Sequence, residues 1–167
     1  LLFKEKPLLL EELNRIRTRH EYISLSNTEI MQMFNEYLTF GGYPAVVLYN
    51  SDKDKLDMLK EIKNSYIKKD IDESNVENTG AFYNLLVILA SQTGNLLNKN
   101  ELSKLLRVHL NTIEKYIYVL QKSYHIDLLK PFFRNLKKEI IKMPKVYFND
   151  LGLRNVLINN FTDINLR

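Results

Sequence analysis

Few residues of this chain have the types and spacing that catalysis or metal binding requires. His20, His109 and His125 have no partner at metal-ligand spacing, and the chain contains no cysteine that could complete a set of ligands. We therefore expect the three histidines to be ordinary surface or helix-capping residues. The sequence predicts no catalytic residue.

The segment "DIDES" offers alternating oxygen ligands at Asp70, Asp72 and Ser74. It lacks the central glycine and the distal bidentate glutamate of a calcium-binding loop, so we expect no metal there. A glycine-rich phosphate loop followed by lysine is also absent from the sequence. The chain alone is therefore not expected to be an enzyme or to hold a cofactor.

The stretch "FGGYPAVVL", residues 40–48, places two of the chain's five glycines side by side before a proline. A turn explains three of these residues, because Gly41 and Gly42 can end one helix and Pro44 can begin the next. The turn does not explain why Tyr43 lies between them. A ligand-binding role for this segment therefore stays open.

A nucleic-acid interface is the other candidate site. If Ile113, Tyr116 and Ile117 are buried, polar side chains at helical spacing lie on or near the outer face of the same helix: Asn111, Thr112, Lys115, Tyr118 and Lys122. Asparagine can pair with adenine, and lysine with guanine or phosphate. Glu114 lies among these residues and counts against a purely basic surface.

The segment 130–145, "KPFFRNLKKEIIKMPK", is strongly basic and carries only one acidic residue. If it forms a hairpin, its cations could contact phosphates beside the helix. The candidates for this contact are Arg134, Lys137 and Lys138.

The elements that position these residues are predicted to be mainly helical. A capping-box pattern at 26–29 predicts a helix that ends at Gly41, followed by a short helix from Pro44 and a longer one over 53–70. Polar residues 71–80 predict a linker. We therefore assign residues 1–78 to a small helical, lid-like bundle.

Residues 79–149 predict a winged helix-turn-helix. Helices are expected from Ala81, from Asn98 and near Asn111, and extended segments with β-branched and aromatic residues follow as a short β-hairpin. Residues 150–167, including "DLGLRNVLINN", predict one more helix, which we assign to the start of a truncated C-terminal segment.

Composition limits the class of protein. The chain has 167 residues, a net charge of +4 and no apolar run long enough to span a membrane. The absence of cysteine fits a reducing compartment, so we expect a cytoplasmic location. The first residue is not methionine, and we expect the chain to be a piece of a longer polypeptide.

Four segments in fixed order carry a family resemblance: "FNEYLTFGGYPAVVL", "LKEIKNSYIKKDI", "LLNKNELSKLLRVHLNTIEKYIYVLQKSYHIDLLKPFFRN" and "PKVYFNDLGLRNVL". From about Phe34 to Leu157, the chain resembles the later part of a prokaryotic family of AAA-type ATP-binding proteins. Those proteins combine a phosphate-loop ATPase domain, a helical lid, a winged helix and a C-terminal nuclease-like domain of unknown function. The resemblance implies that the chain is the lid plus the winged helix.

The resemblance also implies a role for the glycine-proline turn. In related signal-transducing ATPases such a turn approaches the adenine of the bound nucleotide, and Gly42, Tyr43 and Pro44 match it. ATP or ADP with magnesium would then bind the intact protein, with most of the site in a missing N-terminal ATPase domain. The chain departs from the family pattern at Lys69, where arginine is usual, at His109, where serine is usual, and at Ala45, where an acid is common.

The leading hypothesis is a regulatory lid and winged helix that report the nucleotide state of an AAA-type ATPase. The first alternative is a free-standing winged-helix regulator that binds double-stranded DNA. The second is a protein-docking module. Self-association is compatible with all three, and no membrane partner is expected.

Overall fold

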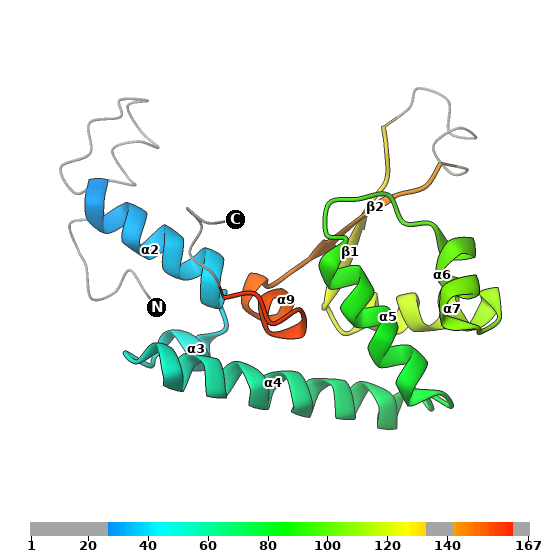
Figure 1. The fold of residues 1–167 in the computed structure, drawn as a ribbon, viewed down its shortest axis with the longest axis horizontal. Coiled ribbons are helices and arrows are strands. Elements are labelled where there is room, and N and C mark those ends of the chain that lie inside the picture. Colours follow the sequence, from blue (N-terminus) through cyan, green and yellow to red (C-terminus); the bar gives the residue numbers. More distant parts are fainter. Residues whose placement is uncertain (1–26, 133–141, 162–167) are drawn as a thin grey trace.

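The computed structural model describes residues 27–132 and 142–161, and Figure 1 shows their arrangement. The first part contains helices α2 (Asn27–Phe40), α3 (Pro44–Val47) and α4 (Asp52–Glu73). The second contains α5 (Thr79–Ser91), α6 (Lys99–Leu106), α7 (Leu110–Lys122), β1 (Ile126–Leu129) and β2 (Lys145–Phe148), and α9 (Leu151–Leu157) follows. The prediction of a mainly helical chain with a short β-hairpin is confirmed.

Helix α2 ends where the sequence predicts. Gly41 has a φ of +75°, and its amide donates to the carbonyl of Tyr37 at 2.9 Å. This is the left-handed termination that glycine favours. Pro44 then takes the first position of α3, where its missing N–H removes no helical hydrogen bond. The predicted N-cap Ser26 lies outside the described residues.

Helix α4 is longer than predicted, and the linker is correspondingly shorter. The helix runs to Glu73, and Asn75 with a φ of 47° turns the chain away from it. Helix α5 already begins at Thr79, because the side chain of Asn78 accepts from the amide of Ala81 at 2.9 Å. The buried Tyr116 bonds both main-chain groups of Asn78 and so fixes this junction.

The second part has the element order of a winged helix-turn-helix. Strands β1 and β2 pair antiparallel, with Ile126 opposite Phe148 and Leu129 opposite Lys145. Leu96, in the connection between α5 and α6, adds one bridge to Lys145 on the other edge of β2. The side chain of Asn98 caps α6 by accepting from the amide of Glu101 at 3.3 Å, as the spacing predicts.

Helix α9 lies at the centre of the molecule, between α2 and α5 and above α4 (Figure 1). It packs against all three of these helices. The helix that we assigned to the start of a truncated C-terminal segment therefore packs between α2 and α4 on one side and α5 on the other. Buried apolar side chains form one continuous core through both parts, including Leu59 of α4, Phe82 of α5, Leu120 of α7 and Leu153 of α9.

Some apolar residues lie outside this core. Phe34 and Tyr37 of α2 are 51% and 42% exposed, and Leu105 of α6 is 63% exposed. An apolar side chain at helical spacing is therefore not always covered by a neighbouring element. Within the described ranges, no helix combines the length and apolar character that crossing a bilayer demands.

Candidate functional site

The glycine-proline turn is held by a residue from the far end of the chain. The amide of Gly42 donates to Oδ2 of Asp150 at 2.8 Å. The other oxygen of the same carboxylate, Oδ1, accepts from the amide of Leu153 at 2.9 Å and caps α9. One side chain therefore fixes both the turn and the start of α9.

Two glycines permit this close approach. A Cβ atom at Gly41 would lie 2.2 Å from Oδ1 of Asp150, and one at Gly152 would lie 2.0 Å from the carbonyl oxygen of Phe40. Both distances are far below van der Waals contact, and the second involves a backbone atom that cannot rotate away. Gly41 and Gly152 are therefore explained by packing between α2 and α9.

Other α9 side chains reinforce the junction. The fully buried Asn155 donates from Nδ2 to the carbonyls of Leu38 at 2.9 Å and Thr39 at 2.8 Å, which satisfies the last turn of α2. Arg154 donates from Nε to the carbonyl of Ala90 at 3.1 Å, near the end of α5. The sequence "DLGLRN" thus contacts α2, the turn and α5.

The turn presents its predicted nucleotide-contacting residues unequally. Gly42 and Pro44 are exposed, whereas Tyr43 is half-buried. The Tyr43 ring meets the Tyr66 ring edge-on, with 5.9 Å between centroids. Burial, followed by the Asp150 carboxylate and Tyr66, raises the pKa of the Tyr43 phenol well above its usual range. Tyr43, which the turn alone did not explain, therefore packs inward.

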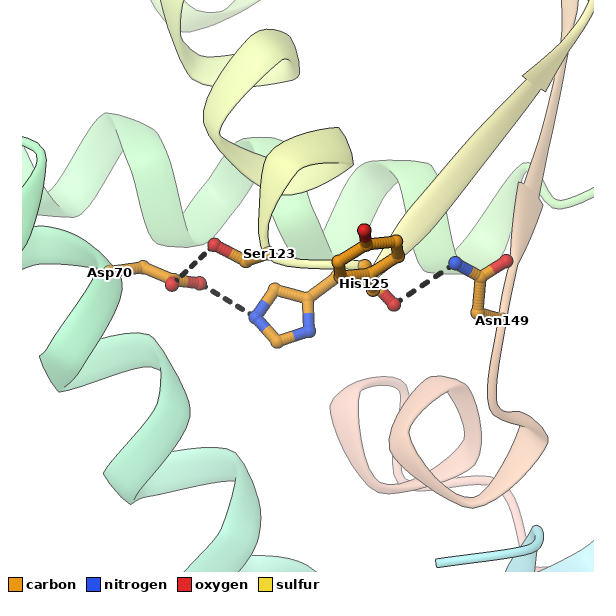
Figure 2. A network of polar contacts seen from close by, with 5 residues as sticks. Asp70, Ser123, His125 and Asn149 are labelled. Carbon is orange, nitrogen blue, oxygen red and sulfur yellow. Dashed lines mark hydrogen bonds and ion pairs between the residues drawn. The ribbon is translucent and has the colours of Figure 1, made fainter.

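A buried polar network lies where α4 meets the start of the wing, the hairpin formed by β1 and β2 (Figure 2). Oδ2 of Asp70 is 2.6 Å from Nε2 of His125, and Oδ1 accepts from the hydroxyl of Ser123 at 2.6 Å. Asp70 is 7% exposed and His125 is 3% exposed. The expectation that His125 is a surface or cap residue is therefore wrong, because its ring is buried against a carboxylate 55 residues earlier in the chain.

The main chain around His125 is equally fixed. The His125 amide donates to the carbonyl of Leu120 at 2.9 Å, and its carbonyl accepts from the amide of Asn149 at 3.1 Å. The Asn149 side chain donates to the carbonyl of Tyr124 at 3.0 Å, as Figure 2 shows. Asp70 therefore holds the segment where α7 ends and β1 begins.

The network is not arranged for nucleophilic catalysis. In a serine-based catalytic site the histidine contacts the hydroxyl and takes its proton, whereas here Ser123 and His125 both bond the central carboxylate of Asp70. A groove of about 570 Å³ lies beside the network, with Tyr66 and Lys69 among its α4 residues and Lys122 among its α7 residues. The geometry supports a structural junction between α4 and the winged helix.

The network also involves the "DIDES" segment, whose oxygens are the candidate metal ligands in the sequence. Both carboxylate oxygens of Asp70 are engaged by Ser123 and His125, while Asp72 is exposed. Within residues 27–132 and 142–161, the acidic and histidine side chains form no cluster of three suited to a metal ion.

The predicted nucleic-acid residues lie on α7, away from the glycine-proline turn. Asn111, Lys115, Tyr118 and Lys122 are exposed, and Thr112 is half-buried. The Lys115 ammonium donates to the carbonyl of Asn75 at 3.1 Å, which directs it toward the connection after α4.

Two further features bear on this surface. Glu114 pairs with Lys99 at 2.8 Å, so its charge is partly balanced. The predicted wing contacts Arg134, Lys137 and Lys138 lie outside the described residues, but Lys130, Lys142 and Lys145 beside them are exposed. His109 precedes α7 without a side-chain capping bond.

Comparison with known proteins gives relatives without an assigned activity. An uncharacterized protein of Methanocaldococcus jannaschii is 24% identical over 86% of this chain and 34% of its own length. An uncharacterized protein of Haemophilus influenzae is 28% identical over 74% of this chain and 32% of its own length. One of Mycobacterium bovis is 26% identical over 71% of this chain and 27% of its own length.

The chain therefore spans about a third of the length of the curated relatives it matches. No solved structure matches it. Residues 31–163, which include every described element from α3 to α9 and most of α2, match a family described as a domain of unknown function, DUF8612. The chain belongs to this DUF8612 family.

Proposed function

We propose that this chain is the regulatory lid and winged helix of a larger AAA-type ATP-binding protein, and that its glycine-proline turn contacts adenine. The observation that carries the proposal is the exposure of Gly42 and Pro44 on a turn that Asp150 and two close-packed glycines hold in place. A preorganised, exposed turn can contact a ligand without first being ordered.

The hydrogen bonds of the turn limit how adenine could be contacted. Asp150 already occupies the amide of Gly42, and the Tyr43 ring packs toward Tyr66. The surfaces left for a base are the ring of Pro44 and the exposed backbone of Gly42. Adenine would therefore stack on an apolar surface, while the phosphates and magnesium would bind a separate ATPase domain.

The length of the relatives supports a multidomain context. Each matched region covers about a third of the relative or less, so those proteins have ample length for a nucleotide-binding domain. The fold gives further support. Helix α9 and the Asp70 network join the proposed lid to the winged helix, so movement of one part can be transmitted to the other.

Nucleotide binding by the longer protein that contains this chain tests the proposal. Pro44→Glu replaces an apolar stacking surface with a charge, and we expect it to weaken binding of a fluorescent ATP analogue about tenfold, since base stacking contributes about 1–3 kcal/mol. Pro131→Glu, the same substitution in the wing, is the matched control and should leave the affinity unchanged. Equal affinities for wild type and Pro44→Glu would refute the adenine contact.

Binding of double-stranded DNA is a second candidate function. The observation that favours it is the shared exposure of Asn111, Tyr118 and Lys122 along α7, with further exposed lysines where β1 ends and β2 begins. This arrangement supplies polar groups for base edges and cations for phosphates.

A further inference from the structure

Tyr66 contacts aromatic side chains from both parts of the molecule. Its ring lies 5.9 Å from that of Tyr43 in an edge-on arrangement, and 6.1 Å from that of His125 in a stacked one. Tyr43 precedes α3 and belongs to the turn, whereas His125 precedes β1 and belongs to the wing. We refer to Tyr43, Tyr66 and His125 as the aromatic relay.

The two ends of the relay are each anchored to backbone. At one end, the amide of Gly42, next to Tyr43, is bonded to Asp150. At the other, His125 is fixed by its main-chain bonds to Leu120 and Asn149 and by its side-chain contact with Asp70. Movement of either backbone segment must therefore displace a ring that packs against Tyr66.

The position of Tyr66 on α4 explains how one residue reaches both ends. Tyr66 and Asp70 are four residues apart in α4, so they share a face of the helix, and both contact His125. Asp70 fixes the imidazole by a polar contact, while Tyr66 covers its ring. Tyr66 is 41% exposed and lines the groove beside the network, so its ring has room to reorient on one side.

We propose that Tyr66 is a positioning residue that transmits the position of the Gly42–Pro44 turn to His125 at the start of the wing. This inference rests on the proposed function for its biological purpose, because the turn is the element assigned to nucleotide contact. The physical coupling itself requires no nucleotide. It is a property of the chain as described and can be measured on the chain alone.

Histidine resonances provide a direct measurement. In carbon-proton spectra of the chain, each histidine gives a separate Cε1–H signal, which His→Gln variants assign. Tyr43→Leu removes the first ring of the relay, and we expect the His125 signal to shift because Tyr66 changes its orientation above the imidazole. His109, exposed before α7, is the internal control and should not shift.

A second substitution tests the route. In a Tyr66→Leu background, adding Tyr43→Leu should no longer shift the His125 signal, because the intermediate ring is missing. A His125 signal that ignores Tyr43→Leu, or that responds equally with and without Tyr66, would overturn the proposal. A response of His109 as large as that of His125 would instead indicate that Tyr43→Leu disrupts the whole fold, and the decision then rests on a second perturbation.

Pro44→Gly provides an independent perturbation if Tyr43→Leu unfolds the chain. Pro44 is exposed, so its replacement removes no core packing and only frees the backbone of the turn. The same pattern is expected: a shift at His125 that depends on Tyr66. The nucleotide-binding experiment with Pro44→Glu is separate, so loss of the adenine contact and loss of the relay are distinguishable results.

Discussion

The carboxylate of Asp150 accepts the amide hydrogen of Gly42 at 2.8 Å, although 108 residues separate the two. The same carboxylate caps α9 through the amide of Leu153. This relationship makes a turn near the start of the described chain depend on a helix near its end. It also explains why the sequences "FGGYP" and "NDLGLRN" are best understood together.

Removing this carboxylate should destabilise the fold. Asp150→Ala deletes a helix cap and a second hydrogen bond, and we expect a loss of about 1–3 kcal/mol in the free energy of unfolding. Urea denaturation followed by circular dichroism measures the change. Asp127→Ala, at an exposed position of β1, is the control and should differ little from wild type. Equal stability of the two variants would contradict the double role of Asp150.

Gly152 should tolerate no side chain. A Cβ there would lie 2.0 Å from the Phe40 carbonyl oxygen, so Gly152→Ala should force α2 and α9 apart at a cost of about 1–3 kcal/mol or more. Gly80→Ala is the matched control. Gly80 lies in the first turn of α5, and a Cβ atom there would be 3.6 Å from its nearest neighbour, Oδ1 of Asn78. That variant should be neutral or more stable, since alanine favours helix. Thermal unfolding of both variants compares them directly.

The buried Asp70 network should be more sensitive than its neighbours on α4. Asp70→Ala leaves the Ser123 hydroxyl and the His125 ring without their carboxylate, and we expect a loss of about 1–3 kcal/mol, the cost of leaving buried polar groups without a hydrogen-bond partner. Asp72→Ala removes an exposed carboxylate two residues away and is the control. If both substitutions reduced stability equally, the network would not be a structural junction.

Tyr43 should make stability depend on alkaline pH. Its pKa is raised in the folded chain, so above about pH 10, the usual tyrosine value, the unfolded chain loses the phenolic proton first. The contribution of Tyr43 to stability is therefore complete below this pH and decreases as the pH rises above it. The urea midpoint should decrease between pH 8 and pH 10.5, and this decrease should be smaller for Tyr43→Phe than for wild type. An identical decrease would exclude a raised pKa at Tyr43.

Binding of DNA, if it uses the α7 surface, should depend on salt in a residue-specific way. Lys122→Ala should weaken binding to any duplex and reduce the slope of log affinity against log salt by about one, the value for one lost phosphate contact. Lys60→Ala, which removes an exposed lysine of α4, should leave the slope unchanged. Fluorescence anisotropy with a labelled duplex over a salt series measures both. Binding that is independent of salt would exclude this interface.

The sequence predicts local features of the fold well. Helix ends follow from individual residues, such as Gly41 with its positive φ, Pro44 at the start of α3 and Asn98 at the start of α6. These signals are readable because each depends on backbone hydrogen bonds within a few positions. The helix-turn-helix order followed from the same kind of evidence.

The long-range contacts could not be predicted in this way. Nothing in the spacing of Asp70 and His125 indicates that they meet, because contact between them depends on how α4 packs beside the wing. Asn155 likewise reads as one polar residue in a short helix until α9 is placed against the end of α2. Phe34 shows a second limit of prediction from sequence. Its apolar side chain lies at helical spacing, yet it is 51% exposed, because a pattern along one helix does not show whether another element packs against that face.

The contact between α2 and α9 also has a consequence for synthesis on the ribosome. Helix α2 is translated more than a hundred residues before Asp150 and Asn155, yet these two residues complete its end and the turn after it. Helices α2 and α4 can therefore reach their final packing only after α9 has left the exit tunnel. Until then, the nascent chain presents an unfinished apolar surface to chaperones.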